Sequence, residues 1–205
     1  MTRTLLLGGG LLVLLAVSYR SCGAPDEPAN DPLRLTDAEK RSVVELAEKE
    51  LRDREMFVGK VYLSKIDVFQ DTHDRASPRK AMVVHYRYAD NAALITGVDV
   101  ARRKVLKVEA VAGFPTPLAP EETARAEKLA RAHPKVKAFL EANNGRVQVE
   151  SYLAHSSVPT DAAFSHRVAN MAFRLDGDYL RAPNVDVDLT AGTVLFPDRM
   201  PMLSN

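Results

Sequence analysis

The 205-residue sequence contains one cysteine and no tryptophan, and aromatic residues make up 6% of it. A single cysteine excludes an intramolecular disulfide, and scarce aromatics disfavour a platform that stacks bases or sugars. The 28 Lys and Arg residues balance 27 Asp and Glu, so the formal net charge is +1. Because phosphate contacts need clustered cationic side chains, we expect no nucleic-acid partner.

The amino terminus is a targeting segment. Arg3 supplies a short positive region, and residues 5–17 are uncharged and apolar. This run has the length of a signal peptide and falls short of the roughly 20 residues that a membrane-spanning helix needs. We therefore expect an exported, extracytoplasmic protein, secreted or anchored to the membrane. Residues 1–34 would form the signal or anchor segment and a polar linker.

Cys22 follows the apolar run at the place where bacterial lipoproteins carry their acylated cysteine. Ser21 fits that pattern, but Arg20 and Tyr19 stand where such proteins usually have small and aliphatic residues. Cys22 is therefore a candidate lipid-attachment residue. An ordinary cleaved signal and an uncleaved anchor with an incidental cysteine remain alternatives. Contact with a membrane is expected only through this segment or through a lipid on Cys22.

Residues 35–114 predict one helix followed by antiparallel strands. Thr36 and Glu39 have the spacing of a capping box at the helix start. Apolar residues then recur at helical spacing, at Val43, Val44, Ala47 and Leu51. In residues 57–69 the alternation slips by one position, which indicates a bulge or bend. Further strands are expected in residues 82–88, 94–100 and 104–111.

Residues 115–200 predict a second unit with the same order, and residues 201–205 form a tail. A helix begins at Pro120, breaks at Pro134 and ends near Gly145, and short strands follow it. Val98-Asp99-Val100 and Val185-Asp186-Val187 lie at matching places, which favours an internal duplication. The expected fold is α+β, with two tandem units that each pack a helix on an antiparallel four-stranded sheet.

Two stretches carry a family resemblance. One is the junction that runs from the strand at residues 105–111 through Pro115-Thr116-Pro117-Leu118 and Glu121-Glu122 to His133-Pro134-Lys135-Val136. The other is Tyr179-Leu180-Arg181-Ala182-Pro183, in which an alanine separates the arginine and proline of the family's Tyr-x-Arg-Pro pattern. Together they resemble the amino-terminal, non-catalytic N2 and N3 domains of copper-containing amine oxidases, which are cystatin-like. The resemblance spans residues 35–197.

The same family implies catalytic residues that this sequence lacks. Its quinone cofactor forms from a tyrosine in an Asn-Tyr-Asp/Glu motif, and three histidines, two of them in a His-x-His pair, bind copper. The sequence contains no Asn-Tyr dipeptide and no His-x-His pair. We therefore expect no catalytic, cofactor-binding or metal-binding residue and no enzyme activity. Copper and topaquinone would belong to a partner chain.

Other candidate sites are weak. The five histidines are His73, His85, His133, His155 and His166. No two have the short spacing typical of metal ligands, and the serines beside His155 and His166 have no nucleophile-elbow pattern around them. Asp67, Asp71 and Asp74 form an acidic cluster with His73. This cluster fits a solvated loop better than a cation site. Arg102-Arg103-Lys104 is expected to be a hairpin tip.

Two functions follow as hypotheses. The first is a non-catalytic accessory protein, the small subunit of a split tyramine or primary-amine oxidase, with a catalytic copper amine oxidase chain as its partner. Amine metabolism enters here only by association with the family. The alternative is a free-standing envelope binding module with no oxidase connection. An independent enzyme ranks last, because no nucleophile, base and metal set converges in the sequence.

Overall fold

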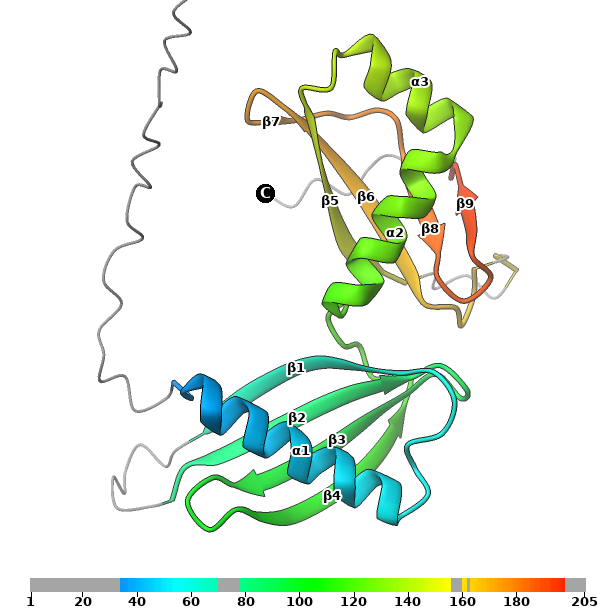
Figure 1. The fold of residues 1–205 in the computed structure, drawn as a ribbon. Coiled ribbons are helices and arrows are strands. Elements are labelled where there is room, and N and C mark those ends of the chain that lie inside the picture. The colour runs from blue at the N-terminus through cyan, green and yellow to red at the C-terminus, as the bar shows by residue number, and fades with distance from the viewer. Residues whose placement is uncertain (1–33, 70–77, 156–159, 162, 198–205) are drawn as a thin grey trace, which may run out of the picture. The chain divides into compact units, whose positions relative to one another are not determined.

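The computed structural model describes residues 34–69, 78–155, 160–161 and 163–197, and these belong to one compact unit of the chain. Nine strands form two antiparallel sheets, and three helices accompany them, so the fold is α+β as predicted (Figure 1). Within the described residues, no helix has the length and apolar character needed to cross a bilayer. We call residues 34–112 the first module, residues 113–118 the connecting segment and residues 119–197 the second module.

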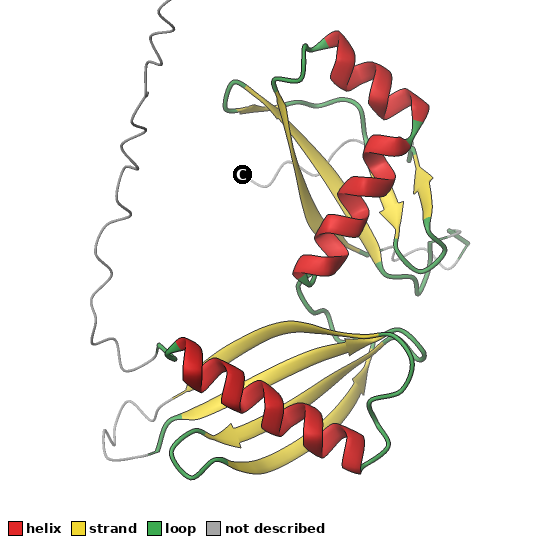
Figure 2. Ribbon diagram, viewed as in Figure 1, coloured by secondary structure: helices red, strands yellow, loops and turns green. Residues whose placement is uncertain are grey.

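The first module is one helix, α1 (Asp37–Asp53), lying across one face of a four-stranded sheet (Figure 2). The sheet order is β1 (Val61–Phe69), β2 (Lys80–Arg87), β3 (Ala92–Asp99) and β4 (Lys104–Ala112). The helix begins where predicted, because Glu39 accepts a hydrogen bond from Thr36 N at 2.9 Å and donates its own amide to the Thr36 hydroxyl. Its buried face consists of Val43, Ala47 and Leu51.

The predicted irregularity in β1 is a bulge at Ser64. Leu63 pairs with His85 and Lys65 pairs with Val84, so Ser64 is the extra residue. The slip lets Leu63 and Ile66 both contact the core that contains Val43. It also leaves Ser64 without a paired residue in β2. The Ser64 hydroxyl donates to Pro117 O at 2.7 Å. The bulge therefore joins β1 to the segment that connects the modules.

The second module packs two helices on one face of its sheet. They are α2 (Pro120–Ala132) and α3 (Pro134–Ala142), separated at Pro134 as predicted. The main sheet order is β5 (Val147–Ala154), β6 (Val168–Leu175), β8 (Val185–Asp188) and β9 (Thr193–Leu195). The four-stranded expectation missed β7 (Asp178–Tyr179), a short strand that pairs with β6. Phe173, Met171 and Ala126 lie in the core.

The two modules repeat one strand-end geometry. Val100 N donates to Arg79 O at 3.0 Å, and Leu189 N donates to Arg167 O at 2.8 Å. Each strand end carries an aspartate that accepts from the backbone amide three residues later, from Arg102 N to Asp99 and from Ala191 N to Asp188. Asp99 thus corresponds to Asp188. The sequence comparison that matched Asp99 with Asp186 was wrong by two residues, because it followed identical letters instead of strand ends.

Candidate functional site: a buried polar junction between the modules

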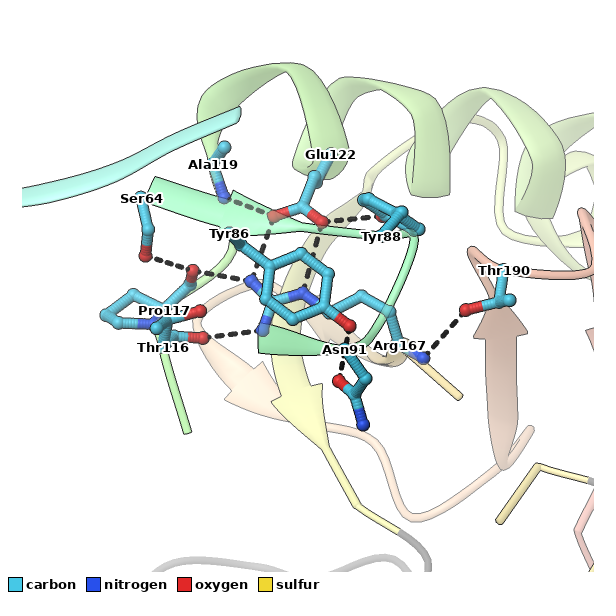
Figure 3. Close-up of polar contacts among 10 residues, drawn as sticks. All are labelled: Ser64, Tyr86, Tyr88, Asn91, Thr116, Pro117, Ala119, Glu122, Arg167 and Thr190. Carbon is cyan, nitrogen blue, oxygen red and sulfur yellow. Dashed lines mark hydrogen bonds and ion pairs between the residues drawn. The ribbon is translucent and has the colours of Figure 1, made fainter. Parts of the chain in front are cut away.

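Arg167 is the centre of a buried polar cluster. It immediately precedes β6, and its side chain is 2% exposed. Nε and Nη2 donate to the two carboxylate oxygens of Glu122 at 3.1 and 2.9 Å. Nη1 donates to Thr116 O at 2.8 Å, and Nη2 also donates to Pro117 O at 2.7 Å (Figure 3). One guanidinium therefore binds both the start of α2 and the segment that connects the modules.

Glu122 is the acidic partner, at the third position of α2, with its side chain fully buried. It accepts from Ala119 N at 2.8 Å and from the Tyr88 hydroxyl at 2.6 Å (Figure 3). Burial alone would raise the pKa of Glu122, but the hydrogen bonds from Arg167, Tyr88 and Ala119 outweigh it and hold this pKa below its usual value. Glu122 is therefore a carboxylate at neutral pH.

Two tyrosines of the first module cover this ion pair. The guanidinium carbon of Arg167 lies 4.2 Å from the centre of the Tyr86 ring, in cation–π geometry. The rings of Tyr86 and Tyr88 meet edge to face with centroids 5.0 Å apart. The Tyr86 hydroxyl donates to Asn91 Oδ1 at 2.5 Å, and Asn91 Nδ2 donates to Ser165 O at 3.2 Å. The contacts thus run between the two modules.

Burial also changes the pKa values of the two tyrosines. It raises the pKa of Tyr86 to about 12, and it raises the pKa of Tyr88 with help from the hydrogen bond to Glu122. Lys60 Nζ lies 4.0 Å from the centre of the Tyr88 ring. Both tyrosines therefore stay protonated at any physiological pH. The junction is suited to holding two modules in one arrangement, because Arg167, Glu122, Tyr86 and Tyr88 bind one another or the neighbouring segments.

Sequence reasoning missed this junction. The sequence places Glu122 only within the stretch that carries the family resemblance and Tyr86 and Tyr88 only within an expected strand, and it does not single out Arg167. A signal was present in the first module, where Glu39 occupies the same third helical position and pairs with Arg79, the residue before β2. Comparing the residue before β2 with the residue before β6 would have singled out Arg167.

The four histidines within the described ranges do not converge on one another. His85 is fully buried, with Nε2 3.8 Å from Glu48 Oε1 and no hydrogen bond to either ring nitrogen. His133 caps α3, since its Nδ1 accepts from Lys135 N at 3.3 Å. His166 Nδ1 lies 2.5 Å from Asp188 Oδ2, and His155 is exposed. Among the described residues, no three His, Cys, Asp or Glu side chains gather as a metal site would require.

The remaining candidates are placed as follows. Asp67 pairs with Lys65 at 2.6 Å, and the Arg102-Arg103-Lys104 segment lies at the turn from β3 to β4 as predicted. Several candidates fall outside the described residues, namely Cys22, Asp71, His73 and Asp74.

In the part of the chain that the structure describes, the histidines are not arranged as copper ligands would be. The four described histidines lie apart: one is buried beside α1, one is at a helix cap, one is beside Asp188 and one is exposed. The sequence also has neither the Asn-Tyr dipeptide nor the His-x-His pair. No copper or quinone chemistry is therefore derived from this chain.

The fold defines a class: an α+β protein with tandem helix-on-sheet modules. A copper-containing benzylamine oxidase from Hansenula polymorpha has a similar fold, with a TM-score of 0.52 and 16% sequence identity over 79% of this chain. This chain spans 29% of that oxidase chain. No family model and no curated protein matches the sequence. The likeness confirms the predicted fold class and supports a relation to copper amine oxidases at the level of fold.

Proposed function

We propose that this protein is a non-catalytic accessory protein, the small subunit of a split copper amine oxidase acting on a primary amine such as tyramine. The supporting observation is the fold likeness to a copper-containing benzylamine oxidase over 79% of this chain and 29% of that one. A chain with this fold and without its own copper ligands or quinone-forming tyrosine would contribute structure, and another chain would contribute the chemistry.

The junction is consistent with such a role. A partner that docks across two modules gains when their arrangement is fixed beforehand, because binding then orders fewer groups. Arg167 binds Glu122, Thr116 and Pro117 within the second module and its connecting segment, and it stacks on Tyr86 of the first. The two modules would therefore meet a catalytic chain as one preformed body.

The test is recovery of a partner from the native envelope. Tagged full-length protein is captured under mild detergent, co-purifying chains are identified by mass spectrometry, and the eluate is assayed for copper, quinone staining and amine-dependent peroxide. We expect a copper- and quinone-containing chain that remains bound through gel filtration. A matched capture with Cys22→Ser separates association through the folded modules from association through a lipid. Recovery of the protein alone, or with partners that lack oxidase activity, would instead favour a free-standing envelope module.

A further inference from the structure

The strand β4 is an open edge of the first sheet. The sheet order β1-β2-β3-β4 ends at this strand, and among the described residues no strand pairs with its outer side (Figure 1). Its side chains are largely exposed, and Leu106 is exposed by 49%. An open edge presents backbone N–H and C=O groups to which a further strand can bind.

The sequence of β4 is complementary to itself about Val108. When two such strands run antiparallel with Val108 opposite Val108 of the second copy, Lys107 of each copy lies opposite Glu109 of the other. Leu106 then lies opposite Ala110. Opposed side chains in an antiparallel pair share one face of the sheet, with Cβ atoms about 5 Å apart, so unlike charges attract and like charges repel. In this register every charge-to-charge pair is an unlike pair.

The two charged side chains are accessible for this contact. Lys107 Nζ and Glu109 Oε1 lie 2.6 Å apart, and the side chains are 66% and 45% exposed. They lie on the same face of the sheet, because they are two residues apart on one strand. In the antiparallel pair, the ion pairs of the two copies would form a square in which each charge has two unlike neighbours. Such a network stabilises more than an isolated surface ion pair does.

One irregularity in β4 is compatible with this register. The pairing with β3 shifts once, at Leu106, and is regular from Lys107 to Ala112. Val108 therefore lies in the regular part of the strand. Leu106, the extra residue of the bulge, falls opposite Ala110, whose small side chain leaves space for it.

The opposite edge of the sheet, β1, has a similar charge pattern but is less open. Lys65 and Asp67 form an ion pair at 2.6 Å, and their side chains are 33% and 37% exposed. The Ser64 hydroxyl, at the bulge of this strand, donates to Pro117 O. Since β1 is already bound to the connecting segment, β4 is the edge of this sheet that fits a second copy.

We propose that two copies of this chain dimerise through β4, antiparallel and centred on Val108, so that their four-stranded sheets join into one continuous sheet. The second copy is the occupant because the register needs a strand with the same order of lysine, valine and glutamate. The same strand of each copy forms the contact, so the interface is isologous and closes as a two-fold dimer. A single pair of strands buries little surface, so the dimer is weak and forms at high concentration.

The experiment is sedimentation of the purified full chain in mild detergent over a wide concentration range, and we expect a monomer–dimer equilibrium. Lys107→Glu and Glu109→Lys each place like charges opposite one another, so each should weaken association at least about tenfold. An equimolar mixture of these two variants should associate again, because the carboxylates of one face the ammonium groups of the other. The exchanged variant Lys107→Glu/Glu109→Lys should dimerise like the unchanged chain, since its charges remain complementary.

The matched control is Lys65→Glu, which alters an ion pair of the same spacing on the other edge and should leave association unchanged. Circular dichroism checks the folding of every variant. If a single variant fails to fold, the exchanged variant decides the matter, because it should dimerise with itself and not with the unchanged chain.

Three outcomes overturn the proposal: a chain that stays monomeric at every concentration, association that Lys107→Glu leaves unchanged, and association that only Lys65→Glu weakens. The last of these would place the contact at β1. None of the three bears on the binding of an oxidase chain, which is measured separately by capture from the envelope.

Discussion

Arg167 of the second module and Tyr86 of the first lie in cation–π contact, 4.2 Å from guanidinium carbon to ring centre. The same guanidinium binds Glu122 and the carbonyl oxygens of Thr116 and Pro117. The Arg167 side chain therefore contacts both modules and the segment between them. Substituting it should disturb the packing of all three.

Arg167→Met should destabilise the protein by about 3 to 5 kcal/mol, because it leaves the buried Glu122 carboxylate without its cation. Arg167→Lys should fall between that variant and the unchanged chain, since an ammonium cannot reproduce the planar fork. Both are measured by urea unfolding, with limited proteolysis of residues 113–118 as a local readout. Cleavage there should increase, because the carbonyls of Thr116 and Pro117 lose their donors.

The matched control for Arg167 is Arg174→Lys, which changes an arginine on the strand that Arg167 precedes, β6, and whose side chain is 33% exposed. It should lower the free energy of unfolding much less than Arg167→Lys does, because ion pairs near the surface contribute little to stability. Equal destabilisation by the two lysine variants would show that the buried Arg167 contributes no more to stability than the partly exposed Arg174.

The double variant Arg167→Met/Glu122→Gln should lower the free energy of unfolding by less than the sum of the two single variants, since the two residues interact directly.

Thr36→Ala should cost about 1 kcal/mol, because the Thr36 hydroxyl accepts from Glu39 N and caps α1. Urea unfolding measures this loss. The comparison is Lys49→Ala, which removes an exposed ion pair with Asp53 near the other end of the same helix and should destabilise the protein less than Thr36→Ala does. A null result for Thr36→Ala would mean that Arg79 alone holds the start of the helix.

Acidification should destabilise the first module through His85. Burial lowers the pKa of His85, and nearby Glu48 only partly offsets this. Above the ordinary histidine pKa of about 6.5 both folded and unfolded states are neutral at this residue, so its contribution is constant. As the pH falls below that value the unfolded chain binds a proton first, so stability is lost until the folded pKa is passed. Glu48 and Arg52 of α1 are the charged groups that influence His85.

The measurement is the melting temperature of the full chain between pH 7.5 and 5. His85→Phe should flatten the decline, because it removes the titrating group while filling a site already in edge contact with Phe57. His155→Gln, at an exposed position, should leave the decline unchanged. If His85→Phe melts with the same pH dependence as the unchanged chain, the acid response belongs to other groups.

The sequence predicted the fold because its local signals agree with one another. The capping box at Thr36, the break at Pro134 and the slip of alternation before Ile66 are short-range patterns, and each appears in the structure. The junction could not be predicted in the same way. Glu122 and Arg167 are joined by tertiary packing across forty-five residues of chain, and nothing local to either indicates the other.

Strand correspondence failed for a related reason. Matching Asp99 to Asp186 relied on identical neighbours, whereas the structure aligns residues by which carbonyl they reach across the sheet. Backbone pairing depends on strands that are distant in the sequence. The corresponding residues of a repeat are therefore identified more reliably from backbone hydrogen bonds than from matching residue types.

The bonds from Arg167 to Thr116 O and Pro117 O have a consequence for multivalent binding. A loose tether between two binding surfaces lets each sample many positions, which dilutes the second contact once the first has formed. Here the tether itself is hydrogen-bonded, so the second surface stays at a set distance from the first. Two individually weak contacts, one on each module, would then add up to durable attachment only for a partner whose own sites have that same spacing.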